Sequence, residues 1–373
     1  MAGLYIHIPF CRQACRYCDF FFSVSLRYVD AYVDCLIQEL KIRAREIPDA
    51  SLETLYLGGG TPSVLSEQNL DKILEAVHQN FTFQENSEWT LECNPDDLSP
   101  GFLSKLKKQG FDRLSIGIQS FHERDLKLMR RSHTAHQADQ SVRDAAEAGF
   151  ENITVDLIYG IPDQSLEEWE SNLHKALSLP LKHLSAYHLT FEPGTVFDHW
   201  RQKGRLVPVH EEESVRQYKL LRNMLAKQGF DHYEISNFAR PGHHSAHNLI
   251  YWSGKVYLGL GPSAHSFDGK GRSWNVSSLK KYMDGIAANK TVRETEIPNP
   301  EEQYHDYLIT SLRTKWGVDP DYLLEHFGAE LANRFHTNST PFLDKGSMQL
   351  SEGRLAIHPD HWLIADHILR ELF

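Results

Sequence analysis

Apolar and polar residues alternate along the first half of the chain in a pattern that predicts strands and helices in turn. Short runs rich in β-branched and aromatic residues, bounded by turn residues, are typical of buried strands. Six such runs occur, at residues 4–9, 52–57, 88–93, 113–119, 152–159 and 183–190. Between the first two, Val29, Tyr32, Val33, Leu36, Ile37 and Leu40 follow the spacing of one helix face. Strand–helix units in succession predict a parallel sheet with right-handed crossovers.

The alternation ends near residue 195, which limits the size of the predicted sheet. A complete eight-unit barrel usually needs about 250 residues, so we predict an α/β fold with a partial (β/α)6 barrel. A further helix is expected over 211–228, and residues 1–230 would form the barrel domain. Residues 231–297, rich in histidine and aromatic residues, are expected to connect and to pack on the barrel. Residues 298–373 return to a helical pattern and predict a small helical or winged-helix C-terminal domain, with a hairpin strand within 349–357.

Composition narrows the classes of function. The formal net charge of −11 disfavours binding to nucleic acid or to anionic membranes, which needs clustered lysine and arginine. No run approaches the roughly 20 apolar residues of a membrane helix, and the start of the chain lacks the basic region of a signal peptide. We therefore expect a cytoplasmic protein without an integral membrane segment. Five cysteines, three of them clustered, fit metal binding in a reducing compartment better than disulfides.

Cys11, Cys15 and Cys18 directly follow the first predicted strand. A cubane iron–sulfur cluster needs four ligands, so three close thiolates would leave one iron open to a small molecule. A zinc site is the alternative, with His7 completing a Cys3His set. A simple electron-transfer cluster is a further alternative.

Other candidate ligand contacts lie at the ends of later strands. The turn after the second strand reads Gly58-Gly-Gly-Thr-Pro-Ser63, and glycines let a backbone approach a ligand closely, although a plain tight turn would also explain them. Glu92, Gln119 and Asp156 lie at or near the ends of the third, fourth and fifth strands. Buried carboxylates need partners. Ligand contact explains the set, and an interior salt bridge with Arg131 is the alternative.

The segment after residue 231 carries a cluster of histidines followed by paired aromatic residues. His243, His244 and His247 precede Tyr251 and Trp252. Such residues could ligate iron and stack on a flat ring, or the two aromatic side chains could simply anchor a loop to the barrel. His265 is a further candidate of the same kind.

Together, these motifs resemble the radical S-adenosylmethionine (SAM) superfamily and, within it, the coproporphyrinogen-related branch. The resemblance implies a [4Fe–4S] cluster on Cys11, Cys15 and Cys18, with SAM chelating the open iron. Tyr5 would lie beside the cluster and the cofactor. The resemblance also implies SAM contacts from Gly59, Gly60, Thr61, Glu92, Gln119, Arg131 and Asp156.

Two features separate this chain from the porphyrin-forming enzymes of that branch. Phe20 stands where those enzymes carry a fourth cysteine, and His247-Asn-x-x-Tyr-Trp252 matches the motif of the HemW-type haem chaperones. The resemblance thus implies haem contacts at His247, Tyr251 and Trp252. It implies a chaperone that binds haem and transfers it to an acceptor, such as a respiratory haem protein, rather than a catalyst, and we assign no catalytic residue. The alternative is a radical SAM oxidoreductase acting on coproporphyrinogen or haem.

Overall fold

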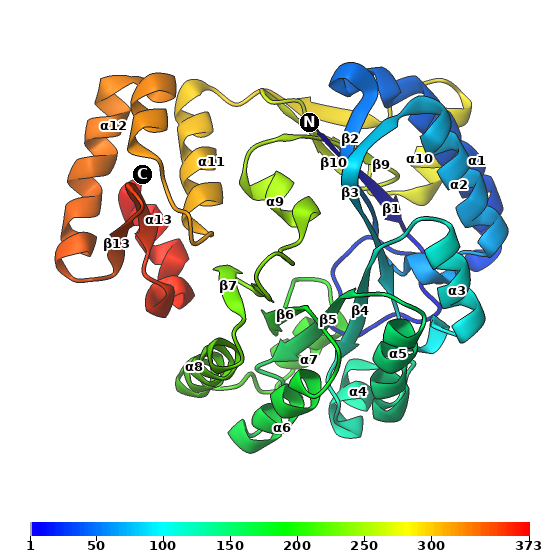
Figure 1. Ribbon diagram of the computed structural model, residues 1–373, viewed down its shortest axis with the longest axis horizontal. Helices are drawn as coiled ribbons and strands as arrows, with labels where there is room; N and C mark the ends of the chain where they lie inside the picture. Colours follow the sequence, from blue (N-terminus) through cyan, green and yellow to red (C-terminus); the bar gives the residue numbers. More distant parts are fainter. Residues whose placement is uncertain (1) are drawn as a thin grey trace.

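The computed structural model describes residues 2–373, and its centre is a 12-stranded sheet (Figure 1). The first six strands follow one another in space as they do in sequence, and each pairs in parallel with the next. They are β1 (Ala2–Ile8), β2 (Ser51–Gly59), β3 (Thr82–Cys93), β4 (Arg113–Gln119), β5 (Asn152–Tyr159) and β6 (His183–His188). The predicted parallel arrangement is confirmed, and the carboxyl ends of these strands meet at one edge of the sheet.

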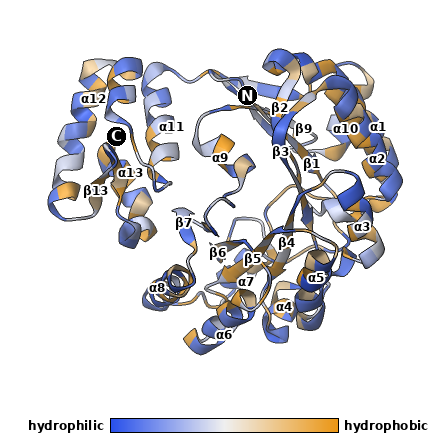
Figure 2. Cartoon of the chain, in the orientation of Figure 1, coloured by the Kyte–Doolittle hydropathy of each residue, from blue (hydrophilic) through white to orange (hydrophobic). Residues whose placement is uncertain are grey.

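Helices connect these strands and cover the outer face of the curved sheet (Figure 1). They are α1 (Val29–Arg43), α2 (Glu67–Asn80), α3 (Pro100–Lys108), α4 (Glu123–Met129), α5 (Ala135–Glu147) and α6 (Leu166–Leu177). The helix starts follow local signals: the Ser99 side chain accepts from the Phe102 N–H, and Ser165 and Glu168 form a capping box. The helices carry hydrophobic and hydrophilic residues (Figure 2). The hydrophobic ones, such as Leu36 of α1, are buried against the strands.

The segment after the barrel lengthens the sheet at both of its edges. After α7 (Val196–Gln202) and α8 (Glu211–Lys227), β7 (Asp231–Glu234) and β8 (Asn237–Ala239) add to the β6 edge. The chain then crosses inside the curve of the sheet through α9 (Ala246–Trp252) (Figure 1). It reaches the β1 edge as β9 (Val256–Leu260), which pairs in parallel with β1. The remaining elements there are β10 (His265–Phe267), β11 (Arg272–Asn275), α10 (Leu279–Ala287) and β12 (Arg293–Glu296).

The C-terminal region is helical and includes the expected hairpin. It contains α11 (Pro300–Leu312), α12 (Pro320–Asp344), β13 (Met348–Ser351), β14 (Arg354–Ile357), a 3-10 helix (Pro359–Ile364) and α13 (Ala365–Leu372). The strands β13 and β14 are antiparallel. Gly328 interrupts α12 with a φ of 80°, so this helix is two segments joined at a glycine. No helix within residues 2–373 is long and apolar enough to cross a membrane.

Candidate functional site

The three clustered cysteines border a cavity of about 700 Å³ at the carboxyl ends of the parallel strands. Cys11, Cys15 and Cys18 are free and partly exposed. Burial raises the pKa of the Cys18 thiol to about 12, and the neighbouring Cys15 and Cys11 thiols act in the same direction. A metal centre that binds these sulfurs must therefore displace protons from them.

The loop that carries the cysteines is held by hydrogen bonds on both sides. The Cys11 N–H donates to the Ser23 carbonyl at 3.0 Å, and the Arg16 N–H donates to the Met129 carbonyl at 3.1 Å. Two side chains donate to the sulfurs: the Thr61 hydroxyl to Cys11 at 3.4 Å, and the Arg131 guanidinium to Cys15 at 3.5 Å.

This donor set fits an iron–sulfur cluster better than a mononuclear zinc ion. Each cysteine of a cubane binds a different iron, so the three sulfurs need not converge on one point. The proposed fourth zinc ligand, His7, is already engaged, because its Nε2 bonds the Phe21 carbonyl at 2.9 Å and its Nδ1 bonds the Tyr5 hydroxyl at 3.0 Å. Within residues 2–373, no three histidine, cysteine or carboxylate side chains converge as ligands of one ion.

The glycine turn after β2 forms one wall of the cavity and approaches the cysteine loop closely. A Cβ at Gly59, whose φ is 105°, would lie 2.5 Å from the His7 ring, and one at Gly60 would lie 2.8 Å from the Phe10 carbonyl oxygen. The Thr61 N–H donates to that same oxygen at 2.8 Å. The missing side chains therefore let the turn pack closely against β1 and the start of the cysteine loop while its residues line the cavity.

Two carboxylates, on β3 and β5, face this cavity on either side of β4, and within residues 2–373 no cationic side chain is hydrogen-bonded to either. Glu92 accepts from the Tyr56 hydroxyl at 2.7 Å and from the Gly59 N–H at 3.0 Å. Burial raises the pKa of Glu92 to about 7. It likewise raises the pKa of Asp156, which accepts from the Ser115 hydroxyl at 3.2 Å, to about 6. Carboxyl groups held in this way favour a cationic ligand, whose charge would restore their ionised form.

Two adjacent arginines follow α4, and the second borders the cavity. Arg130 is exposed and closes α4 with a φ of 59°, whereas Arg131 borders the cavity. Arg131 donates at 2.6 Å to the Asn94 side chain and to the Gly117 carbonyl. Through these two bonds, Arg131 links the ends of β3 and β4. It does not form the interior salt bridge with the strand carboxylates that was the alternative to ligand contact. Its buried Nε has no hydrogen-bond partner within residues 2–373.

Gln119 also borders the cavity, at the end of β4. Its φ is 69°, and the pairing of β4 with β5 shifts register between Gly117 and Gln119. Such irregularities at strand ends re-aim a side chain. The predicted SAM contacts other than Tyr5 thus surround the same cavity as the cysteines.

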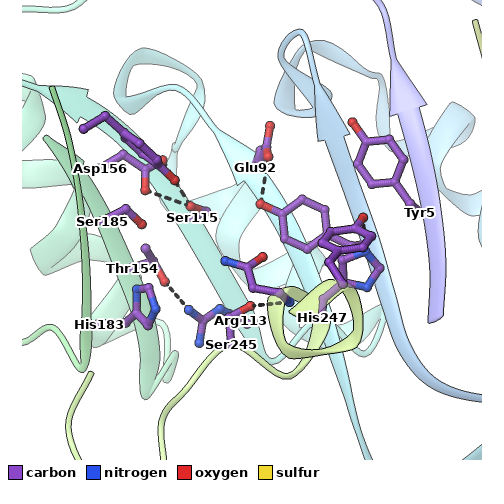
Figure 3. A pocket seen from close by; sticks show the side chains of 14 residues that line it. Tyr5, Glu92, Arg113, Ser115, Thr154, Asp156, His183, Ser185, Ser245 and His247 are labelled. Carbon is purple, nitrogen blue, oxygen red and sulfur yellow. Dashed lines mark hydrogen bonds between the residues drawn. The ribbon is translucent and has the colours of Figure 1, made fainter. Parts of the chain in front are cut away.

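A second cavity of about 300 Å³ lies inside the barrel (Figure 3). Glu92, Ser115, Asp156 and Tyr187 border both cavities. Tyr5 lines this inner cavity and not the cysteine cavity, and its hydroxyl bonds the His7 Nδ1 at 3.0 Å. Its place beside the cluster and SAM stays a prediction.

The predicted haem contact His247 also faces the inner cavity (Figure 3). It is buried, and both of its ring nitrogens are bonded, to the Thr54 hydroxyl at 2.7 Å and to the Tyr251 hydroxyl at 2.8 Å. Its ring stacks on Tyr56 at 4.9 Å. Trp252 is partly exposed and borders neither cavity. In this geometry, His247 offers no free nitrogen to an iron, and the haem contacts stay a prediction.

The helix α9 that carries the motif is docked onto the strands. Glu88 of β3 accepts from the N–H groups of Ala246 and His247 at 3.2 and 3.1 Å, which caps the start of the helix. A Cβ at Gly3 would lie 2.7 Å from Ile250, so β1 and α9 are in close contact. A chain of contacts then runs from His247 through Tyr56 to Glu92 and the glycine turn. The motif thus supports the wall of the cysteine cavity from behind.

Sequence reasoning missed several residues of the cysteine cavity. Asn94 follows β3, and His188 ends β6, so polar residues at strand ends were an available signal for both. Trp362, Leu363, Ala365 and Asp366 also border the cavity, and no local pattern could reveal this. The C-terminal region therefore contributes to the mouth of the barrel.

Comparison with known proteins agrees with this arrangement. The model of the radical SAM superfamily matches residues 5–176. The heme chaperone HemW of Bacillus subtilis is 37% identical over 371 residues, which span 99% of this chain and 98% of that protein. The chain belongs to the radical SAM superfamily. Within it, the chain groups with the HemW proteins, including the heme chaperone HemW of Escherichia coli, which is 36% identical over 79% of this chain and 80% of that protein.

Relatives in the radical SAM superfamily extend to mammals. The mitochondrial radical S-adenosyl methionine domain-containing protein 1 of mouse is 37% identical over 85% of this chain and 74% of that protein. The structure of coproporphyrinogen III oxidase (HemN) from Escherichia coli has a TM-score of 0.86 and 24% identity, and the alignment covers 100% of this chain and 89% of that one. At this identity, the likeness shows the fold alone. Membership of the superfamily implies SAM and a [4Fe–4S] cluster.

Proposed function

We propose that this chain is a haem chaperone that binds haem and transfers it to an acceptor haem protein. The observation that carries the proposal is the full-length similarity to proteins named as heme chaperones, at 37% identity over 371 residues for the one from Bacillus subtilis. The cavity at the barrel mouth supports it, because about 700 Å³ lies within the usual range of pockets for small molecules and cofactors.

We further propose that Cys11, Cys15 and Cys18 hold the cluster and that the surrounding polar residues bind SAM. When bound, the cluster and SAM supply one-electron and radical chemistry. The backbone of Gly59 and Gly60 would accept the close approach of the ligand. The cationic groups of SAM would lie near Glu92 and Asp156, whose raised pKa values favour a positive neighbour.

The residues of this chain would orient the cofactor rather than react. Arg131 and Thr61 donate to cysteine sulfurs and would stabilise negative charge on the cluster. Tyr56 and the Gly59 N–H hold the Glu92 carboxyl group in one orientation.

The test is a haem titration of the anaerobically reconstituted protein, followed by mixing with an apo-haem protein whose holo spectrum is known. A shift in haem absorbance, and then the spectrum of the holo acceptor, is the expected result. Absence of haem binding would sink the proposal. If SAM is converted to 5′-deoxyadenosine while a porphyrinogen or haem is altered, the chain is instead an enzyme acting on tetrapyrroles.

A further inference from the structure

The lining of the cysteine cavity falls into two parts. The first comes from the cysteine loop and from β2 to β5, and contains the proposed cluster ligands and SAM contacts. The second comes from the end of β6, from α8, from the loop after β7 and from residues 362–366. Because β6 is the last of the six parallel strands, this second part lies toward the opposite edge from β1. It has no role in the proposed SAM site.

His188 is the one imidazole that borders this cavity among residues 2–373. It ends β6, where the carboxyl ends of barrel strands present ligand contacts, and it is exposed. Its Nε2 bonds the Ser214 hydroxyl of α8 at 2.9 Å. Within the described residues no partner bonds its Nδ1, so one ring nitrogen remains available.

The surroundings hold this ring in one orientation. A Cβ at Gly160, whose φ is 73°, would lie 2.6 Å from the His188 Nε2, so the missing side chain gives the ring its space. The Tyr159 ring packs against it edge to face at 5.1 Å. Although the residue is open to solvent, partial desolvation of its ring lowers the pKa of His188, which favours the neutral imidazole that binds metals. A hydrogen bond at one nitrogen that leaves the other free is the usual arrangement of a metal-bound histidine.

The walls around His188 suit a flat, largely apolar ligand. Phe20, Phe22, Tyr218, Ile235 and Leu363 border the same cavity. Phe20 and Leu363, which are 65% and 41% exposed, add apolar surface at the rim of this cavity. An apolar pocket with one oriented histidine is the environment of a haem bound through a proximal imidazole.

We propose that His188 is an axial ligand of the haem iron, with the macrocycle seated between the end of β6 and residues 362–366. This inference rests on the proposed function as a haem chaperone. It places the haem beside the cluster and SAM, and separates it from the buried His247 of the motif. The C-terminal region would then form one side of the haem seat.

The test is a titration of the full-length, anaerobically reconstituted protein with ferric haem, for wild type, His188→Ala and His136→Ala. His136 of α5 is also exposed but does not border the cavity, so it is the matched control. Second-shell partners of metal-bound histidines alone contribute about 10- to 100-fold in affinity, so losing the ligand itself should weaken binding by at least about tenfold. The haem spectrum should lose its imidazole character, and added imidazole should restore it in His188→Ala only.

The outcomes separate the two proposals. If wild type binds no haem, the proposed function fails and this inference fails with it. If wild type binds haem and His188→Ala has the same affinity and spectrum, only the ligand assignment is overturned. A loss of binding that imidazole does not restore would overturn it as well, since His188 would then act by packing. His188→Gln, which can keep the hydrogen bond to Ser214, repeats the test should the alanine variant lose its cluster.

Discussion

The substitution His247→Ala tests how the motif helix is held in the barrel. The imidazole is buried, and its removal deletes hydrogen bonds of 2.7 and 2.8 Å to Thr54 and Tyr251. Each such bond contributes about 1 kcal/mol net, and leaving the buried partner unpaired adds to the loss. The stacking on Tyr56 is also lost, and the cavity that remains has a cost of its own. Together, these terms predict a loss of about 3 kcal/mol in the free energy of unfolding.

The assay is urea unfolding of the protein without cluster, wild type against variant. His265→Ala is the control, because an exposed side chain should change stability by less than about 0.5 kcal/mol. Tyr251→Phe removes only one of the two bonds and should cost about 1 kcal/mol. If His247→Ala is as stable as His265→Ala, the ring is not bonded as described and the docking of α9 is wrong. If the prediction holds, weaker haem binding by His247→Ala is not in itself proof of direct contact.

Three further predictions concern the cysteine cavity. Cys15→Ser should abolish the cluster, seen as loss of iron and of visible absorbance after anaerobic reconstitution, and a full cluster in the variant would contradict the ligand set. The pKa of Glu92 is about 7 in the fold against an ordinary 4.5, so its stabilising effect is complete below pH 4.5 and is lost as the pH rises to 7. Between pH 4.5 and 7, the melting temperature of the cluster-free protein should therefore fall less in Glu92→Gln than in wild type. An identical pH dependence in the two proteins would refute the raised pKa of Glu92. Gly60→Ala should weaken SAM binding in equilibrium titration, because its Cβ would lie 2.8 Å from two backbone carbonyl oxygens, whereas Gly101→Ala meets nothing within 4 Å and should bind SAM as wild type does.

The elements of the barrel were predictable because they rest on local signals. Strands β4 and β5 begin and end at the predicted residues, and capping serines start α3 and α6. These features depend on residues within a few positions of one another. The short strands β7 to β12 were missed, because three to five residues are too few to show the alternating pattern by which a strand is recognised in a sequence.

The composition of the cavity needed the fold. Strand-end positions correctly placed Glu92, Gln119 and Asp156 at one edge, because parallel strands end together. Tyr5 was expected beside the cysteines too and lines the inner cavity, which shares Glu92 and Asp156 with the cysteine cavity. His188 had the same strand-end signal as the others and was overlooked.

The sequence by itself determined the superfamily and the parallel sheet. Three cysteines spaced within eight residues and a regular alternation of strands and helices are local facts, and no distant contact is needed to state them. Only the tertiary structure decided the role of the motif helix and of the C-terminal region. His247 is bonded to Thr54, 193 residues away, and residues 362–366 reach the mouth of a barrel that begins at residue 2. The physical reason is that burial and hydrogen-bond partners are set by packing between distant segments, which spacing along the chain does not specify.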